Sequence, residues 1–158
     1  MKKSERTPTG EALSDLVLDL FRLTSLLLTA GDRLVAGLGL TSARWQILGA
    51  MAAAERPQPV AWLARDMGAN RQNVQRIIND LQNDGLVAFE VNPHHRRAQL
   101  VVLSDKGRRT FKAAMELQAP WINRISDGLS AKDIQTVHSV GTALRNRLVG
   151  NGEVEDRT

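Results

Sequence analysis

The first third of the chain carries apolar residues at intervals of three and four, which is the spacing of one face of a helix. This stripe consists of Leu13, Leu16, Val17, Leu20, Leu23 and Leu27, with Phe21 and Leu28 beside it. The pattern fades between Gly31 and Gly39. Residues 1–10 are polar, and we expect them to fray. We therefore predict an amphipathic helix over about residues 11–36.

Two shorter helices are predicted next. Thr41 or Ser42 caps the first, because a hydroxyl can accept a hydrogen bond from a free backbone N–H group. The segment 56–59 ends it, since proline cannot continue a helix. Its inward side chains are Trp45, Ile47, Leu48 and Met51. The second helix covers about residues 60–67, and a tight turn at 68–70 follows it.

A fourth helix and a β-hairpin come after this turn. The helix is predicted over 71–84, with Asn70 as its N-cap and Gly85 just after its C-terminus. Its buried face consists of Val74, Ile77, Ile78 and Leu81. The period then changes, and residues 86–91 and 98–103 are rich in valine, leucine and phenylalanine. These two segments are predicted to pair as short strands across a polar link.

Two more helices complete the pattern. Ser104 caps the first, which covers about residues 105–127 and which Pro120 is expected to kink. Ser130 caps the second, whose apolar seam is Ile134, Val137, Val140, Leu144 and Leu148. We expect the tail from Gly150 to be loose.

The order of helix, short helix, glycine turn, helix and hairpin is that of a winged helix-turn-helix. We therefore predict a mainly α protein with a small β-hairpin, organised as one domain over residues 1–158. The DNA-binding core is placed at about 40–107, and the flanking helices at about 11–36 and 108–149 are predicted to mediate dimerisation. A single winged domain of this size cannot bury the apolar stripes of both flanking regions.

The amino-acid composition excludes several kinds of functional site. The chain has 158 residues and no cysteine, so thiolate metal sites, a cysteine nucleophile and thiol redox sensing are excluded. It contains no phosphate-binding glycine loop, nucleophile elbow or metal-ligand spacing, so we expect neither catalysis nor a cofactor. No apolar run is long enough for a membrane span, and the expected location is the cytoplasm. The net charge of +4 is compatible with a nucleic-acid partner.

The polar side of the fourth helix is the most informative feature. Gln72, Gln75, Arg76 and Asn79 share this side, and Arg71 and Asn73 flank it at the N-terminal end. Glutamine and asparagine can pair with adenine in the major groove, and arginine can pair with guanine. These six residues are therefore predicted to read DNA. The alternative is a solvated surface helix that happens to be rich in amides.

The link between the predicted strands holds His94, His95, Arg96 and Arg97. Arginines in the wing of such a domain contact backbone phosphates or the minor groove, so these four residues are predicted to bind DNA. The alternative is a charged turn that keeps the hairpin soluble. A metal site is disfavoured, because the two histidines are adjacent in sequence and no cysteine accompanies them.

Basic residues also follow the second predicted strand. They are Lys106, Arg108 and Arg109. The sequence does not decide whether they contact phosphates near the wing or form a solvated helix face.

An ordered set of segments resembles the MarR family of bacterial transcriptional regulators. These segments are residues 40–48, 63–64, 70–76, 81–87 and 96–107. The resemblance implies an obligate homodimer in which the first helix and the last two helices interleave with those of the partner. It also implies double-stranded DNA as a partner, with two recognition helices on a pseudo-palindromic operator, and a small aromatic or anionic effector that weakens DNA binding.

The resemblance also assigns particular residues. The arginine of the family's Asp-x-Arg wing motif corresponds to Arg97, but His95 stands where the family has aspartate. That aspartate braces the wing arginine in the family, so its replacement changes how the wing is held. By the same analogy a ligand pocket is expected near Arg44 and Trp45, with a plain core role for Trp45 as the favoured alternative.

These observations together predict a sequence-specific, DNA-binding transcriptional regulator, a ligand-responsive repressor rather than an enzyme. The alternative is a winged-helix module that binds another protein. Such a module would expose apolar residues on the fourth helix, and the polar face described above argues against it. A protein that coats DNA without specificity would carry lysines in place of the amides.

Overall fold

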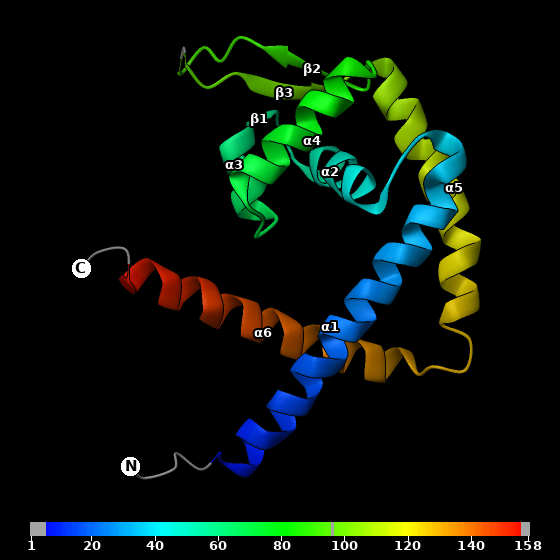
Figure 1. The fold of residues 1–158 in the computed structure, drawn as a ribbon, viewed down its shortest axis with the longest axis vertical. Coiled ribbons are helices and arrows are strands. Elements are labelled where there is room, and N and C mark those ends of the chain that lie inside the picture. The colour runs from blue at the N-terminus through cyan, green and yellow to red at the C-terminus, as the bar shows by residue number, and fades with distance from the viewer. Residues whose placement is uncertain (1–5, 96, 156–158) are drawn as a thin grey trace. The chain divides into compact units, whose positions relative to one another are not determined.

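The computed structural model describes residues 6–95 and 97–155, and the side chains as far as residue 150. In chain order the elements are α1 (Pro8–Val35), the 3-10 turn η1 (Ala36–Leu38), α2 (Ser42–Ala53), β1 (Gln58–Pro59), α3 (Val60–Asp66), α4 (Arg71–Asn83), β2 (Val87–Glu90), β3 (Leu100–Leu103), α5 (Asp105–Ile125) and α6 (Ala131–Glu155) (Figure 1). The chain divides into two compact units, Met1–Ala119 and Pro120–Thr158, and the first of them holds the winged helix-turn-helix. The predicted fold class is confirmed.

The sheet has three strands, where the sequence predicted two. Its order is β1-β3-β2, and both pairs are antiparallel. In the hairpin, Val87 lies opposite Leu103 and Glu90 lies opposite Leu100, so each strand is shorter than its predicted segment. The third strand is the two-residue β1, in which Gln58 pairs with Val101. The sequence did not predict it, because a segment of two residues, one of them a proline, shows no strand periodicity, and only its pairing with β3 defines it as a strand.

The core of the first unit lies between α2, α3, α4 and the sheet. All four residues predicted for the inner face of α4 are buried: Val74, Ile77, Ile78 and Leu81. Ile47 and Leu48 of α2 are almost fully inaccessible, and Val101 of β3 closes the core on the sheet side. Burial of this apolar face fixes which side of α4 points to solvent, and that side is the polar one.

The predicted helix ends are confirmed at several positions. The Thr41 hydroxyl accepts a hydrogen bond from the Arg44 N–H, and the Asn70 side chain accepts one from the Asn73 N–H at 3.1 Å. The Ser104 hydroxyl accepts one from the Gly107 N–H at 2.9 Å. Gly85 has φ +73°, the left-handed conformation that glycine adopts without strain at the end of a helix.

Helix α6 runs to Glu155, so the expectation of a loose tail from Gly150 is wrong for this part of the chain. A glycine inside a helix costs only about 1 kcal/mol relative to alanine, and no proline follows to stop the helix. Pro120 lies inside α5 at the boundary of the two units, and the kink expected there stays a prediction. Within the described residues, no helix is both long enough and apolar enough to cross a membrane.

Candidate nucleic-acid interface

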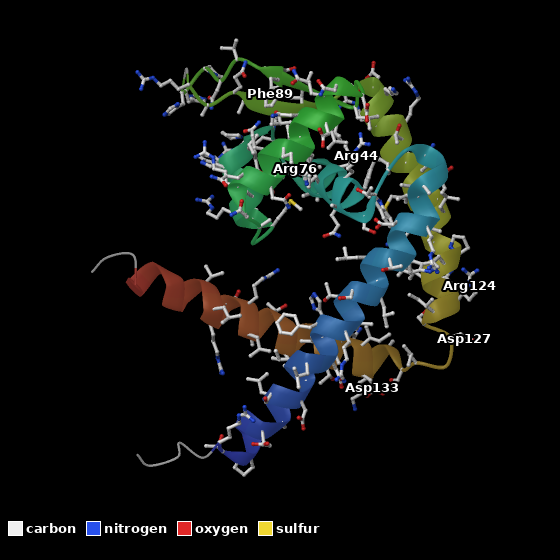
Figure 2. The ribbon with its side chains drawn as sticks, in the orientation of Figure 1. Arg44, Arg76, Phe89, Arg124, Asp127 and Asp133 are labelled. Carbon is white, nitrogen blue, oxygen red and sulfur yellow. The ribbon has the colours of Figure 1, made fainter. Side chains whose placement is uncertain are left out.

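The outward side of α4 carries the residues predicted to read DNA. Five of them are exposed, namely Arg71, Gln72, Asn73, Arg76 and Asn79, and Gln75 is half-buried. They face solvent because the opposite side of the helix packs into the core. The side chain of Arg76 is labelled on this helix in Figure 2.

Hydrogen bonds along α4 hold these side chains in order. The Gln75 amide nitrogen donates to the Asn79 side-chain oxygen at 2.9 Å, and the Arg76 guanidinium donates to the Asn73 side-chain oxygen at 3.0 Å. Arg76 also lies 3.6 Å from a carboxylate oxygen of Asp80. All these groups are exposed, so each bond contributes little to stability and can be exchanged for a bond to a ligand.

A groove separates α4 from the hairpin, and we call it the α4–hairpin groove. Its polar lining consists of Arg71, Gln75, Asn79 and Gln82 from α4 with Arg97 and Gln99 from the hairpin segment. The described lining holds two guanidinium groups and no carboxylate. The structure therefore brings Arg97 beside the polar face of α4, which sequence spacing alone could not show.

The hairpin loop is built around Asn92, which is buried although its side chain is polar. Its side-chain oxygen accepts a hydrogen bond from the His94 N–H at 3.0 Å, and its carbonyl accepts one from the His95 N–H at 3.3 Å. The side chains of His94, His95 and Arg97 are exposed. Arg96, also predicted to bind DNA, lies outside the described residues. Sequence reasoning missed Asn92, although asparagine in a polar link is a common turn former.

The imidazoles of the loop do not gather with other metal ligands. In the part of the chain that the structure describes, no three His, Asp or Glu side chains come together as a metal site would require.

The C-terminal end of α4 is tied to both α2 and α5. Arg44 of α2 forms an ion pair with Asp84 and also donates to the Gly39 carbonyl at 2.9 Å. Lys106 of α5 donates to the Asp84 carbonyl at 2.7 Å, and the Ser104 hydroxyl donates to the Gly85 carbonyl at 2.7 Å. These contacts fix the turn between the recognition helix and the hairpin, and they give Lys106 a structural role.

The residues expected near a ligand pocket have other contacts. Trp45 is partly buried and packs against the core cluster. Arg44 holds Asp84, as described above. Trp45 therefore has the core contacts of its favoured alternative role, and the ligand pocket near it stays a prediction.

Comparison with known proteins places this arrangement in a family. A model of the MarR family matches residues 38–98, which include α2, α3, α4 and the first hairpin strand, β2. An uncharacterized protein of Mycobacterium tuberculosis is 36% identical over 140 residues, which cover 89% of this chain and 94% of that protein. The transcriptional activatory protein BadR of Rhodopseudomonas palustris is 32% identical over 107 residues, or 65% of this chain and 59% of BadR.

Among solved structures, the transcriptional repressor CouR bound to a 23-mer DNA duplex has the same fold. It superposes with a TM-score of 0.74 at 23% identity, covering 89% of this chain and 99% of CouR. The family match covers the recognition helix, the first hairpin strand and all of the loop as far as residue 98, including Arg97 of the groove. This chain therefore belongs to the MarR family of transcription regulators.

Proposed function

We propose that this chain is a homodimeric repressor that binds a pseudo-palindromic DNA operator through α4 and the hairpin loop. The observation that carries the proposal is the α4–hairpin groove, in which amides and guanidinium groups of both elements meet without a carboxylate in the described lining. Such a surface attracts the negatively charged phosphates of DNA, and its amides can distinguish one base edge from another.

The reading of bases is assigned to Arg71, Gln72, Asn73, Gln75, Arg76 and Asn79. The Gln75–Asn79 hydrogen bond leaves the Gln75 side-chain oxygen as an acceptor and the Asn79 amide nitrogen as a donor. An adenine edge offers a donor and an acceptor in the major groove, so the two side chains together match it. Arg76 can pair with guanine once it exchanges its bond to Asn73.

The hairpin loop supplies the contacts to the DNA backbone. Arg97 lines the groove, and His94 and His95 are exposed on the same loop. We assign these residues and Arg96 to phosphates or the minor groove beside the major groove that α4 enters. His95 stands at the position of the aspartate in the family motif and does not supply its carboxylate. We infer that the hydrogen bonds between Asn92 and the loop backbone hold this wing in its place.

Dimerisation is supported by apolar side chains that the chain leaves uncovered. On α1, Phe21 and Leu26 are each 69% exposed, and on α6, Val137 is 56% exposed. A helix with this much apolar surface is normally buried. A second copy of the chain would cover these side chains. The resulting dimer would present two α4 helices, one for each half-site of the operator.

We also propose that a small-molecule effector changes the affinity of this protein for DNA. CouR from Rhodococcus jostii RHA1 has been crystallised with p-coumaroyl-CoA, so this fold accommodates small ligands in that relative. We infer that this chain also responds to a small aromatic or anionic molecule. Repression is assigned by analogy with CouR, whereas BadR is named an activator. Transcription of a reporter from the operator, with and without the protein, decides the sign of regulation.

The proposal is tested by selecting bound fragments from genomic DNA and footprinting the best of them. We expect a protected pseudo-palindrome with two half-sites about one helical turn apart. If no sequence is enriched over random DNA, the proposal fails and the winged-helix module that binds protein becomes the better account.

Replacing Arg76 should relax the preference for a base pair. We expect Arg76→Ala to lose about 1–3 kcal/mol of operator binding and to bind all bases more equally at one position in each half-site. Binding to random DNA should change much less. Titration of an operator series with single base changes measures this, and an equal loss on operator and random DNA would remove the base-reading role.

Replacing Arg97 should weaken DNA binding without changing the preference for any base pair. We expect Arg97→Ala to weaken binding to operator and random DNA alike, because a phosphate contact carries no sequence information. The slope of log affinity against log salt concentration should fall by about 1 per lost contact. Arg76→Ala is the matched control, since it removes the same type of side chain from the other wall of the interface. A salt slope that stays unchanged would contradict the phosphate contact.

A further inference from the structure

Two hydrogen bonds join α1 to the start of α2, and both belong to Ser42. The Ser42 backbone N–H donates to a carboxylate oxygen of Asp32 in α1 at 2.6 Å. The Ser42 hydroxyl donates to the carbonyl of Leu28, one turn earlier in α1, at 2.7 Å. Ser42 is buried although its side chain is polar. We call these two hydrogen bonds the α1–α2 joint.

A glycine and two apolar residues bring the helices together at this joint. Gly31 is buried, and a Cβ atom at its position would overlap the Ser42 hydroxyl. Its φ angle is not positive, so the close approach of α2 favours glycine here, not the backbone conformation. Val35 and Leu40 are buried beside the joint. Apolar contacts of this kind are not directional, whereas hydrogen bonds are, so the joint fixes the angle between two helices that the apolar residues hold in contact.

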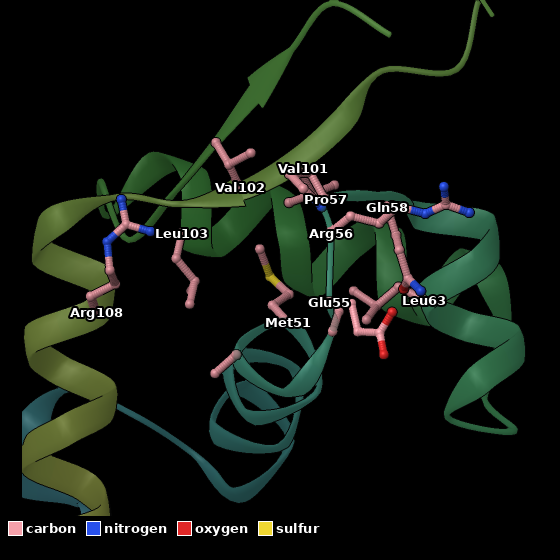
Figure 3. Close-up of a pocket in the computed structure, with 12 residues that line it drawn as sticks. Met51, Glu55, Arg56, Pro57, Gln58, Leu63, Val101, Val102, Leu103 and Arg108 are labelled. Atoms are coloured by element: carbon pink, nitrogen blue, oxygen red, sulfur yellow. The ribbon is translucent and has the colours of Figure 1, made fainter. Parts of the chain in front are cut away.

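Helix α2 connects the joint with both DNA-binding elements. It packs against α4 and β3. Near its start, Arg44 forms an ion pair with Asp84, the residue that follows α4. At its far end, Met51 lines a cavity at the root of the hairpin together with Val101 and Leu103 of β3 (Figure 3). A rotation of α2 against α1 would therefore move the recognition helix and the hairpin together.

The angle at the joint limits the operators that a dimer can bind. In the proposed dimer, α1 carries apolar side chains that the second copy covers, so a joint lies between the dimer interface and each α4. One added base pair moves the half-sites about 3.4 Å apart and turns them by about a tenth of a helical turn. Two recognition helices that are held at a fixed angle cannot follow this change.

We propose that Asp32 and Ser42 determine which half-site spacing the dimer accepts, because they hold α1 and α2 at one angle. They are positioning residues, since both lie outside the polar face of α4 and the hairpin loop. This inference rests on the proposed function as a homodimer on a pseudo-palindromic operator.

The rigidity of the joint is measured first, on the free protein. The chain has no cysteine, so Gln72→Cys places one nitroxide label on the exposed side of α4 in each protomer. Electron–electron dipolar spectroscopy then gives the distribution of distances between the two α4 helices of the dimer. We expect a narrow distribution in the otherwise wild-type chain and a broader one after Asp32→Ala/Ser42→Ala. Ser25→Ala is the matched control, because its hydroxyl donates to the Phe21 carbonyl within α1 and joins no second element.

The spacing preference is measured next, on duplexes with one base pair added to or removed from the centre of the selected operator. Wild type and Ser25→Ala should lose at least about tenfold in affinity on both duplexes, since linked sites lose avidity when geometry prevents simultaneous contact. Asp32→Ala/Ser42→Ala should lose less than about threefold, because its two recognition helices can still reach both half-sites. All three proteins should bind a duplex with one half-site equally, whereas a misfolded variant would lose this affinity as well.

Gly31→Ala disturbs the joint without replacing either of its two positioning residues. Its methyl group displaces the Ser42 hydroxyl from the Leu28 carbonyl, so this variant should also broaden the distances and relax the spacing preference. In the Asp32→Ala/Ser42→Ala chain it should change nothing further. The hydroxyl is then absent, and the added methyl group lies at an ordinary contact distance of 3.5 Å from the Cβ atom of residue 42.

The possible outcomes separate this inference from the proposed function. An unchanged distance distribution in Asp32→Ala/Ser42→Ala would overturn the rigid joint. A broader distribution with the wild-type spacing preference would overturn its role in specificity. A labelled chain without dipolar coupling is not a dimer, which would refute both the proposed function and the spacing role. A dimer that selects no operator would refute the proposed function alone, and the distance distribution would still decide whether the joint is rigid.

Discussion

A Gly107→Ala variant should lose about 3 kcal/mol or more of its free energy of unfolding, the upper range for overpacking a tight contact. A Cβ atom at Gly107 would lie 2.0 Å from the Leu86 carbonyl oxygen and 3.0 Å from its carbon. Both atoms are backbone, so no side-chain rotation relieves the contact. The same carbonyl accepts a hydrogen bond from the Ser104 N–H at 3.1 Å, which holds α5 against the start of the hairpin.

Denaturant unfolding followed by circular dichroism measures this loss. Gly37→Ala is the matched control, because it adds the same methyl group in the same unit at a glycine with no positive φ, where no heavy atom lies within 4 Å. This control should be neutral or gain up to about 1 kcal/mol, because alanine reduces the conformational entropy of the unfolded chain. If both variants unfold at the same denaturant concentration, α5 does not approach Leu86 as closely as the structure shows.

The helices and the two hairpin strands could be predicted because their signals are local. Buried residues of α4 recur every three or four positions, and the caps at Asn70 and Ser104 are side chains next to the helices they cap. Strand β1 has no such signal, because it consists of two residues that are defined by their partners in β3. Gly107 entered the sequence argument only through the family resemblance, since its close neighbour Leu86 is distant in sequence.

The interface could be predicted in its parts but not as a whole. The polar face of α4 follows from the helical period, and the basic loop follows from its composition. That Arg97 lines the same groove as Gln75 and Asn79 depends on how the hairpin packs, which no local pattern gives. The contact of Lys106 with the Asp84 carbonyl likewise joins residues that are separated by the hairpin.

The wild-type chain should sediment at twice its 17.4 kDa mass at low micromolar concentration. The Leu27→Glu variant should disrupt this dimer and reduce operator affinity by at least about 100-fold. Leu13, Leu20 and Leu27 recur every seven residues on one face of α1, and Leu27 is 41% exposed in the single chain. A carboxylate at this position would be buried twice in a symmetric dimer, and an unpaired buried charge costs several kcal/mol. The loss of DNA affinity follows because each monomer then binds one half-site independently. Linking two binding units in one dimer raises the affinity for the whole operator by a factor of about 100 to 10,000.

Leu27→Met is the matched control for this variant, because it changes the same exposed side chain but keeps it apolar and similar in volume. Such a substitution should leave both the mass and the operator affinity within about twofold of wild type, since swaps that conserve volume and apolar character are tolerated best. Sedimentation velocity and operator titration are carried out on both variants. A Leu27→Glu protein that remains dimeric and binds its operator with wild-type affinity would show that α1 does not form the dimer interface.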